Sequence, residues 1–406
     1  MLAASTSRGA HASRVLDAAS RRNAPASPRN DAVPTATPAP FTRDGSPALE
    51  AHLAHTCEKI AAGLRGLLPP HKLEAVLLGG GYGRGEGGVL HTPDSDRPYN
   101  DLEFYVFLRG NRHFNELRHG RALHVLGEIL TPQAGVEVEF KIASLRELAR
   151  RPVDMFSYDL VAGHRWLVGG EELLRSCAHH RDATRIPLCE ATRLLMNRCT
   201  GLLLARERLQ REVFSAADAD FVRRNIAKAE LALGDAVLVA FGEYHWSVIE
   251  RHRRLERICA TERLSWLDNV LVPHAAGVEF KLHPVRSQAS RAELQAQHRE
   301  LAILAWFIWE WIENRRLGAT FQIPTGYAAS RIDKWPDSPS PRNLALNFKA
   351  LGYRACLPPK ALRHPRERVL NALALLLWTP DITQSPASLA RVQSELNTKS
   401  SDFPAL

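Results

Sequence analysis

The sequence predicts an α/β domain with a small mixed sheet, followed by an all-α helical domain. Two observations carry this prediction. Between about residues 49 and 182, apolar or alternating runs typical of strands are interspersed with segments of helical periodicity. Beyond Pro187 the strand patterns stop, and proline-containing breaks separate segments whose apolar residues recur at helical intervals. We therefore expect four parts: a tail (1–48), the α/β domain (49–182), a helical domain (183–285) and a C-terminal helical region (286–406).

Composition limits the classes of protein that fit. The chain has 406 residues, 45% of them hydrophobic, and a net charge of +9. Because both signs of charge are interspersed, a globular protein from an arginine-rich proteome is favoured over a dedicated nucleic-acid binder. Six cysteines without a C-x-x-C pair are typical of reduced thiols, and the densest apolar stretch, Leu301–Trp309, is too short to cross a bilayer. We expect a cytoplasmic protein without a membrane partner.

The first 48 residues are rich in Ala, Ser, Arg, Pro and Thr and poor in aromatic and branched apolar residues. Such a segment buries too little surface to offset its ordering entropy, so we predict disorder. Its arginine- and serine-rich start is similar to a transit peptide, although a plain tail or a wrongly assigned start codon fits better.

The elements of the α/β domain follow from local patterns. Ser46-Pro47 is an N-cap followed by a first-turn proline, and it opens a helix that ends at Pro69-Pro70. The residues from Gly135 to Ile142 alternate as in a strand. The other predicted strands are Ala75–Leu78 and the apolar run that ends at Leu108. The other predicted helices are Phe114–Leu130, which stops near Pro132, Leu145–Arg150 and a helix that begins at Glu171. A turn and a short strand are predicted between Tyr158 and Gly170.

The helical half contains five segments with helix-period apolar patterns. We read Pro273 and the other prolines of this half as breaks between helices, and Trp306, Trp309 and their aromatic neighbours as core. The predicted helices are 188–212, 218–241, 246–264, 289–315 and 364–378.

Two carboxylates open the strand that ends at Leu108. Asp101 and Glu103 are two residues apart, so they project from one face of the strand. The apolar run that follows them is typical of a buried strand, where acids are costly unless a cation compensates them. Mg²⁺, which takes oxygen ligands, is the economical candidate. The later alternating strand offers a third carboxylate, Glu137 or Glu139, and at least one of these two belongs to a solvated strand face.

Seven glycines lie between the first two predicted strands. Gly83–Gly88 matches G-x-G-x-x-G, but residues 89–98 read as a loop, whereas a dinucleotide site needs a helix there. Walker-type G-x-x-x-x-G-K-[ST] and protein-kinase motifs are missing from the sequence. What remains is a glycine turn between a strand and a candidate metal-binding strand.

Together these residues resemble the nucleotidyltransferase superfamily of DNA polymerase β and the aminoglycoside nucleotidyltransferases. The resemblance rests on Leu-Leu-Gly79-Gly-Gly-Tyr-Gly-Arg-Gly-Glu-Gly, on Asn100-Asp-Leu-Glu-Phe-Tyr-Val and on the later Val-Glu139-Phe, and it covers roughly residues 50–180. It implies a polymerase-β-like domain. The chain departs from the family pattern in the longer loop at residues 86–100 and in having Glu as the second and third acids.

The resemblance also implies roles for individual residues. Asp101, Glu103 and Glu139 would hold two Mg²⁺ ions and form the catalytic triad, with Glu139 as a metal ligand or as the base for an acceptor hydroxyl. Gly80 and Gly81 would bind phosphates through backbone N–H groups. Arg84 either contacts phosphate or forms a surface salt bridge, and a helix face with Asn225, Lys228 and Asp235 either closes over the phosphates or is solvated. The implied nucleotide-binding residues are Gly80, Gly81, Tyr82, Arg84, Asn225 and Lys228.

The expected reaction is the Mg²⁺-dependent transfer of a nucleoside monophosphate from a nucleoside triphosphate, such as ATP, to a hydroxyl, with release of pyrophosphate. The acceptor is left open as a small molecule, a protein side chain or a nucleic-acid end. Two alternatives also stay open: a catalytically inactive nucleotide-binding or regulatory module of the same fold, and an RNA-modifying nucleotidyltransferase.

Overall fold

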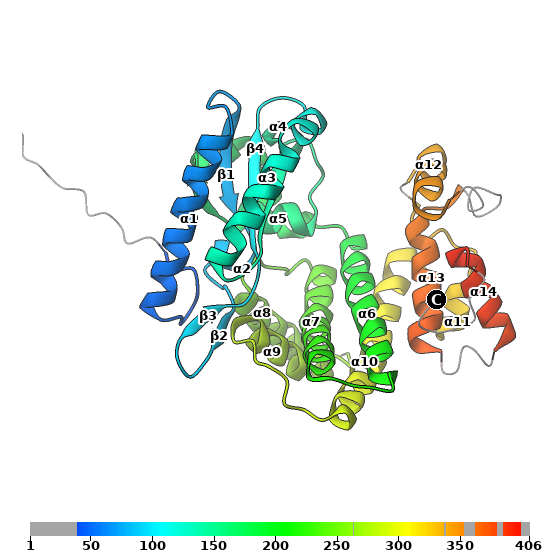
Figure 1. The fold of residues 1–406 in the computed structure, drawn as a ribbon. Coiled ribbons are helices and arrows are strands. Elements are labelled where there is room, and N and C mark those ends of the chain that lie inside the picture. The colour runs from blue at the N-terminus through cyan, green and yellow to red at the C-terminus, as the bar shows by residue number, and fades with distance from the viewer. Residues whose placement is uncertain (1–38, 263, 337, 353–361, 380–384, 399–406) are drawn as a thin grey trace, which may run out of the picture. The chain divides into compact units, whose positions relative to one another are not determined.

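The computed structural model describes residues 39–262, 264–336, 338–352, 362–379 and 385–398 (Figure 1). The chain from Pro40 onward forms one compact unit. Residues 1–38, for which we predicted disorder, lie outside the described residues. Cys356, one of the six cysteines, also lies outside them. The stretch 40–48, which we assigned to the tail, instead contacts the domain at its start and enters helix α1 at its end: Phe41 and Thr42 are buried, and both donate backbone N–H groups to the Glu50 carboxylate.

A four-stranded mixed sheet organises the N-terminal half, as predicted. Its strands lie in the order β5-β4-β1-β6; β4 and β5 are parallel, and the other neighbours are antiparallel. The register places Glu103 of β4 directly beside Glu139 of β5. The strands are β1 (Leu73–Leu78), β4 (Leu102–Leu108), β5 (Val138–Ala143) and β6 (Arg165–Val168).

Helices cover both faces of this sheet because the central strands are apolar on both sides. Alternate residues of β1 and β4, such as Val76 and Phe104, pack with α1 (Pro47–Leu67) and α3 (Arg112–Ala134) on one face. Their neighbours, such as Leu77 and Phe107, form a second cluster on the other face. That face is covered by α4 (Leu145–Leu148), α5 (Met155–Ala162) and the 3₁₀ helix η1 (Glu171–Arg181).

Three local predictions in this half were wrong. Residues 89–98 form an antiparallel hairpin of β2 (Val89–His91) and β3 (Asp96–Pro98) rather than a loop. Helix α3 runs past Pro132 and ends at Gly135, which adopts a left-handed φ of 75°, because a proline in the last turn removes only one backbone hydrogen bond. The segment from Tyr158 to Gly170 contains the predicted short strand as β6, but its first five residues belong to helix α5, whose N-cap Asp154 accepts the N–H of Ser157 at 2.6 Å.

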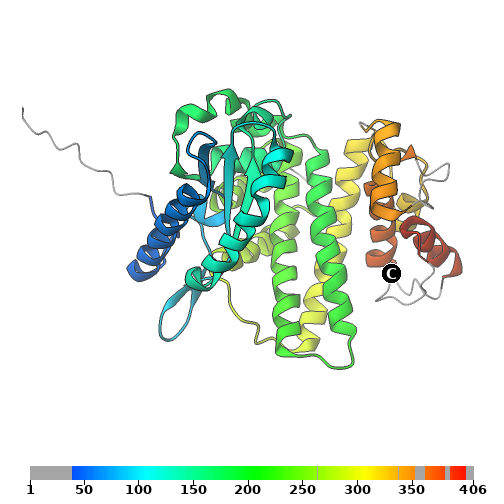
Figure 2. The same cartoon turned by 45° about the horizontal axis from the view of Figure 1, so that its top comes forward.

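The C-terminal half is helical, as predicted, and its long helices α6, α7 and α10 lie side by side (Figures 1 and 2). Trp309 is fully buried among them, which confirms its place in the core, whereas Phe307 is half exposed. The five predicted helices appear as α6 (Cys189–Gln210), α7 (Ala216–Phe241), α8 (Val248–Thr261), α10 (Arg291–Leu317) and α13 (Pro365–Trp378).

Helix α9 (Asp268–Leu282) was missed because Pro273 was read as a break. The proline lies in the second turn, where the helix loses one backbone hydrogen bond but continues. Gly277 then lets α9 approach α7 closely, since a Cβ there would lie 2.5 Å from the Leu231 nitrogen. The remaining helices missed by sequence reasoning are the 3₁₀ turn η2 (Ala183–Arg185), α11 (Pro324–Ala329), α12 (Ser340–Leu351) and α14 (Pro386–Leu396).

Candidate functional site

Three carboxylates predicted from the sequence meet at one edge of the sheet. Asp101 immediately precedes β4, Glu103 lies on β4, and Glu139 is its register partner on the parallel strand β5. One carboxylate oxygen from each lies within 4.8 Å of those from the other two. Their side chains are partly open to solvent, 27% for Glu103 and 45% for Glu139. The acidic trio (Asp101, Glu103 and Glu139) is therefore accessible to a ligand.

A lysine that the alternation of the later strand places on one face with Glu137 and Glu139 lies among these acids. The Lys141 ammonium is 2.6 Å from Glu103 Oε1 and 3.0 Å from Glu139 Oε2. Burial alone would lower the pKa of Lys141, but the hydrogen bonds to both carboxylates raise it above its ordinary value. The strand alternation contained the signal, since Lys141 shares a face with Glu139. We had expected a metal to compensate these acids; within the protein, the ammonium does so in part.

The glycine turn lies against the acidic trio. It forms the one-turn helix α2 (Gly80–Gly83) directly after β1. Gly80 has a φ of +61°, and a Cβ on it would lie 3.4 Å from Glu103 Oε2. Within the described part of the chain, no acceptor faces the amides of Gly80 and Gly81, which begin this turn. The turn therefore presents backbone donors beside the carboxylates.

Tyr82 holds the glycine loop, and Arg84 forms a salt bridge, which was one of its two expected parts. Tyr82 is buried: its hydroxyl donates to the Gly88 carbonyl at 2.8 Å and accepts the Tyr99 N–H at 2.9 Å, and burial raises its pKa to about 12. It fixes the glycine loop rather than facing the cleft. Arg84 forms a 3.1 Å ion pair with Asp159 of α5 and is 9% exposed, so its salt bridge is largely buried. Arg84 also lines the cleft described next.

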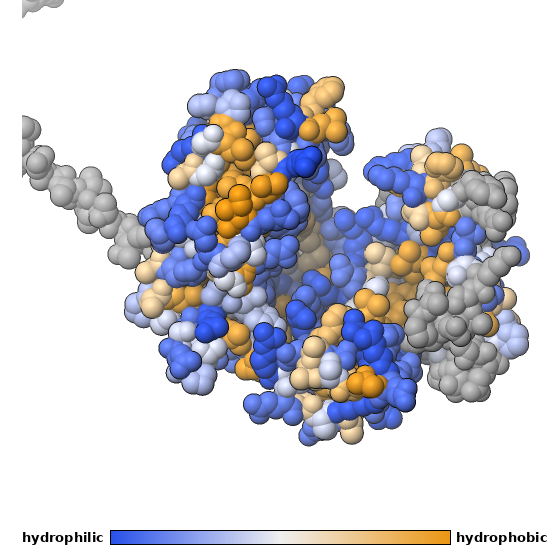
Figure 3. All heavy atoms as spheres, viewed as in Figure 1, coloured by the Kyte–Doolittle hydropathy of each residue, from blue (hydrophilic) through white to orange (hydrophobic). Residues whose placement is uncertain are grey.

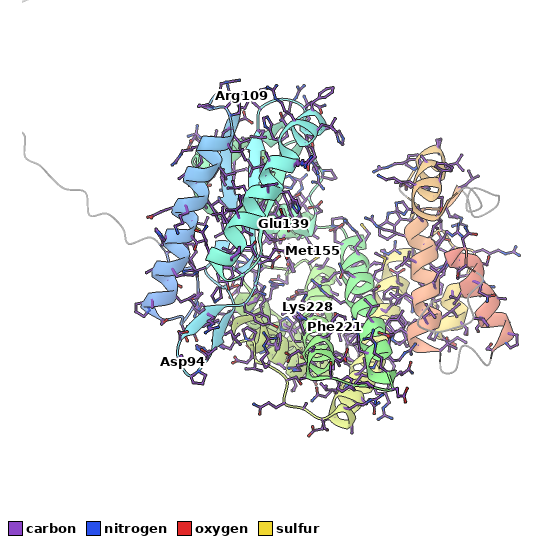
Figure 4. All side chains as sticks on the ribbon, in the orientation of Figure 1. Asp94, Arg109, Glu139, Met155, Phe221 and Lys228 are labelled. Atoms are coloured by element: carbon purple, nitrogen blue, oxygen red, sulfur yellow. The ribbon has the colours of Figure 1, made fainter. Side chains whose placement is uncertain are left out.

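A cleft of about 530 Å³ separates the acidic edge of the sheet from the helices. Figure 3 shows this face hollowed there, with mainly hydrophilic residues around the hollow. In Figure 4, Glu139, Met155 and Lys228 follow one another from β5 across α5 to α7. Cationic residues dominate the charged lining: Arg84, Arg198, Arg224, Lys228, Arg251 and Lys281, against Asp101, Glu137, Asp159 and Asp235. This cleft favours an anionic ligand.

Two lysines of the helical half reach the cleft from different helices. Desolvation, with smaller contributions from Arg198 and Arg224, lowers the pKa of Lys228 on α7. Desolvation and the nearby Arg84 lower the pKa of Lys281 on α9 to about 8, although Asp101 acts in the opposite direction. Helix α9 was missed by sequence reasoning, and so was Lys281. Lysines in a cleft whose pKa is lowered by burial are candidates for a functional site.

The other two residues of the predicted α7 face do not join Lys228 as ligand-binding groups. Asn225 turns toward α6: its Nδ2 donates to the Phe221 carbonyl at 2.9 Å, and its Oδ1 lies against Gly201. It is not among the residues that line the cleft. Asp235 is buried in an ion pair with Arg251 and lies 3.4 Å from His274 Nε2, so it is neither solvated nor free.

Glu86 fastens the glycine loop to the helical half. It is 4% exposed, and its carboxylate accepts the Ser247 hydroxyl and, at 2.9 Å, the Val248 N–H at the start of α8. Negative charge at a helix N-terminus is favourable. No pattern in the sequence pairs a loop glutamate with a helix 160 residues later, so this contact was not predicted.

Comparisons with protein-family models, curated proteins and solved structures found no match. None of the described helices is both long and apolar enough to cross a membrane.

Proposed function

We propose that the chain is a Mg²⁺-dependent nucleotidyltransferase with a polymerase-β-like domain, which moves a nucleoside monophosphate from a nucleoside triphosphate to a hydroxyl acceptor and releases pyrophosphate. One observation carries the proposal. The acidic trio lies beside the Gly80 turn, and its member Asp101 lines a cleft whose opposite wall is basic. Oxygen ligands, backbone donors and cations are the parts that phosphoryl transfer requires.

The acidic trio fits a hard divalent cation. Its donors are carboxylate oxygens, the ligands that Mg²⁺ prefers, and the ammonium of Lys141 among them shows that their charge attracts a cation. Asp101, Glu103 and Glu139 would hold the metal. When bound, Mg²⁺ supplies charge neutralisation at the phosphates and lowers the pKa of an attacking hydroxyl.

Residues of the chain itself bind the phosphates, neutralise their charge and accept the proton of the acceptor. The amides of Gly80 and Gly81 donate to phosphate oxygens, while Lys228 and Lys281 neutralise charge from the helical wall. Glu139, the more exposed of the two glutamates, accepts the proton of the acceptor hydroxyl. The acceptor enters through the solvent-facing side of the acidic trio.

Lys141 favours a second candidate function, a nucleotide-binding module without transfer activity. Its ammonium bridges Glu103 and Glu139, so metal binding requires this side chain to turn aside. In a non-catalytic module, Lys141 would instead stay in place and the basic cleft would hold nucleotide without metal.

The test uses the full chain with α-labelled nucleoside triphosphates, Mg²⁺ and panels of small hydroxyl compounds, proteins and RNA ends. We expect Mg²⁺-dependent label transfer and pyrophosphate release, both lost in the Asp101→Ala, Glu103→Ala double variant. Glu116→Gln, an exposed acid on α3, is the matched control and should keep both. Nucleotide binding that ignores metal, with no transfer to any panel, would instead support the non-catalytic module.

A further inference from the structure

Three segments far apart in the sequence place metal-ligating side chains together outside the cleft. Asp44 lies in the segment before α1, His91 ends β2, and His283 is the C-cap of α9. One ligand atom of each lies within 4.8 Å of the other two. His283 Nε2 is 2.6 Å from Asp44 Oδ2, and the two imidazole rings stack with centroids 5.8 Å apart.

Each histidine is oriented by a second carboxylate. His91 Nδ1 lies 2.7 Å from Asp96 Oδ1, and the other oxygen of Asp96 accepts the Ser46 N–H at 2.7 Å. His283 Nδ1 lies 2.8 Å from Glu279 Oε1. A carboxylate at Nδ1 holds the proton on that nitrogen and leaves Nε2 with a lone pair. This carboxylate–histidine arrangement is the usual outer support of a histidine that ligates zinc.

The contact between His283 and Asp44 itself requires a cation. If Nδ1 donates its proton to Glu279, then Nε2 and the Asp44 carboxylate face each other as two acceptors. A proton on Nε2 resolves this conflict in the metal-free protein. A metal ion can take the same place.

We propose that Asp44, His91 and His283 bind one Zn²⁺ ion through a carboxylate oxygen and two imidazole nitrogens. Nitrogen donors favour zinc over Mg²⁺ or Ca²⁺, which take oxygen ligands. Asp44 and His91 are exposed, so a fourth position is open to water. We name this group the His-Asp cluster. It is separate from the acidic trio in both donors and position, and it does not depend on the proposed function.

Such an ion would clamp parts of both halves of the molecule. It joins the segment before α1 and the β2–β3 hairpin to the end of α9. Lys281 lies two residues before His283 and lines the cleft, so the clamp would also hold that end of the basic wall. Because the three ligands are brought together only by folding, zinc binding stabilises the native state.

The test titrates the full chain, stripped of metal with a chelator, with zinc chloride near neutral pH. Calorimetry and elemental analysis measure affinity and stoichiometry, and thermal unfolding measures stabilisation. We expect one bound equivalent and a higher melting temperature with zinc. His91→Gln and His283→Gln should each lose the bound equivalent and the zinc-induced shift, and Asp96→Asn should bind about 10–100-fold more weakly.

His124→Gln is the matched control, because His124 is an exposed histidine whose carboxylate partner, Glu128, lies on the same helix. It should bind zinc like the unaltered chain. Melting curves in chelator alone identify any variant that fails to fold, and His91→Gln, at an exposed position, should melt normally. The proposal is overturned if the unaltered chain binds no zinc equivalent, or if a folded His91→Gln, His283→Gln double variant keeps it.

Discussion

Two sets of acids reach the same cleft, the acidic trio through Asp101 and a second set through Asp159 and Asp235, and they differ in what surrounds them. Asp101 is exposed, and Glu103 and Glu139, which are partly open to solvent, share one lysine, Lys141. Asp159 and Asp235 line the cleft as well, but each has an arginine as a close partner. The Tyr244 hydroxyl donates to Asp159 at 3.2 Å, and His274 adds a second partner to Asp235.

The difference separates carboxylates that hold the molecule together from carboxylates that are available to a ligand. Burial alone would raise the pKa of Asp235, but Arg251 and His274 lower it, so this acid is ionised and committed to its partners. Among the described residues, Lys141 is the one cation that forms an ion pair with the acidic trio, and it reaches two of the three carboxylates, which leaves the trio able to take a metal. The sequence placed Asp235 on the helix face that was a candidate for ligand binding. Its contacts in the structure show that it is instead paired within the protein.

The largest expected effect is the loss of stability when a buried acid that is paired with an arginine is replaced. Asp235→Ala leaves Arg251 buried without its partner, and we expect the free energy of unfolding to fall by about 3–5 kcal/mol. Urea denaturation followed by circular dichroism measures this. Asp94→Ala, at the exposed tip of the β2–β3 hairpin (Figure 4), should change it by less than about 0.5 kcal/mol. Equal losses of stability in the two variants would show that the ion pair of Asp235 contributes no more to stability than an exposed acid does.

Glu86→Gln should have a smaller but clear effect. The neutral amide loses the charge-assisted bonds to Ser247 and to the start of α8, and we expect a loss of about 1–3 kcal/mol in the same denaturation experiment. Because Glu86 fixes the glycine loop, nucleotide affinity should fall with it. An unchanged unfolding curve would show that this contact does not hold the loop to the helices.

Much of this arrangement was predictable because local patterns dictate it. The alternation around Glu103 and Glu139 fixes which side chains share a face, and the buried run after Asp101 fixes a central strand. What was missed depends on tertiary contacts. Helix α9 and its Lys281 were not predicted because Pro273 was taken as a break. Tyr82 was predicted to bind nucleotide because its hydrogen-bond partners, Gly88 and Tyr99, become its neighbours only in the folded loop.

The basic wall makes a pH-dependent prediction. Lys281 titrates at a pKa of about 8 when folded, against 10.5 as its ordinary value, so between these pH values the unfolded chain holds a proton that the folded chain has lost. Stability should therefore rise with pH across this window, and Lys281→Met should flatten the rise. Nucleotide affinity should change the other way, weakening by at most about tenfold per pH unit above 8. Affinity that is independent of pH from 7 to 9 would exclude Lys281 from the phosphate site.

The smallest effect concerns Lys141. Replacing it with Met removes the cation shared by Glu103 and Glu139, and because the pair is partly exposed we expect stability to change by no more than about 1 kcal/mol. Mg²⁺ affinity should rise, since the acidic trio loses its competing ammonium. Calorimetric titration with Mg²⁺ measures this, and weaker metal binding in the variant would show that Lys141 supports the site rather than competing for it.

The most direct test of the central claim does not require the acceptor to be known. Mn²⁺ serves as a spectroscopic substitute for Mg²⁺, and electron paramagnetic resonance follows its binding to the full chain with a non-hydrolysable nucleoside triphosphate analogue. We expect the analogue to bind far more tightly with metal than without it, and Asp101→Asn to abolish this dependence while leaving the unfolding curve unchanged. Equal nucleotide binding with and without metal, in both the unaltered chain and the variant, would contradict a nucleotide–metal site at Asp101.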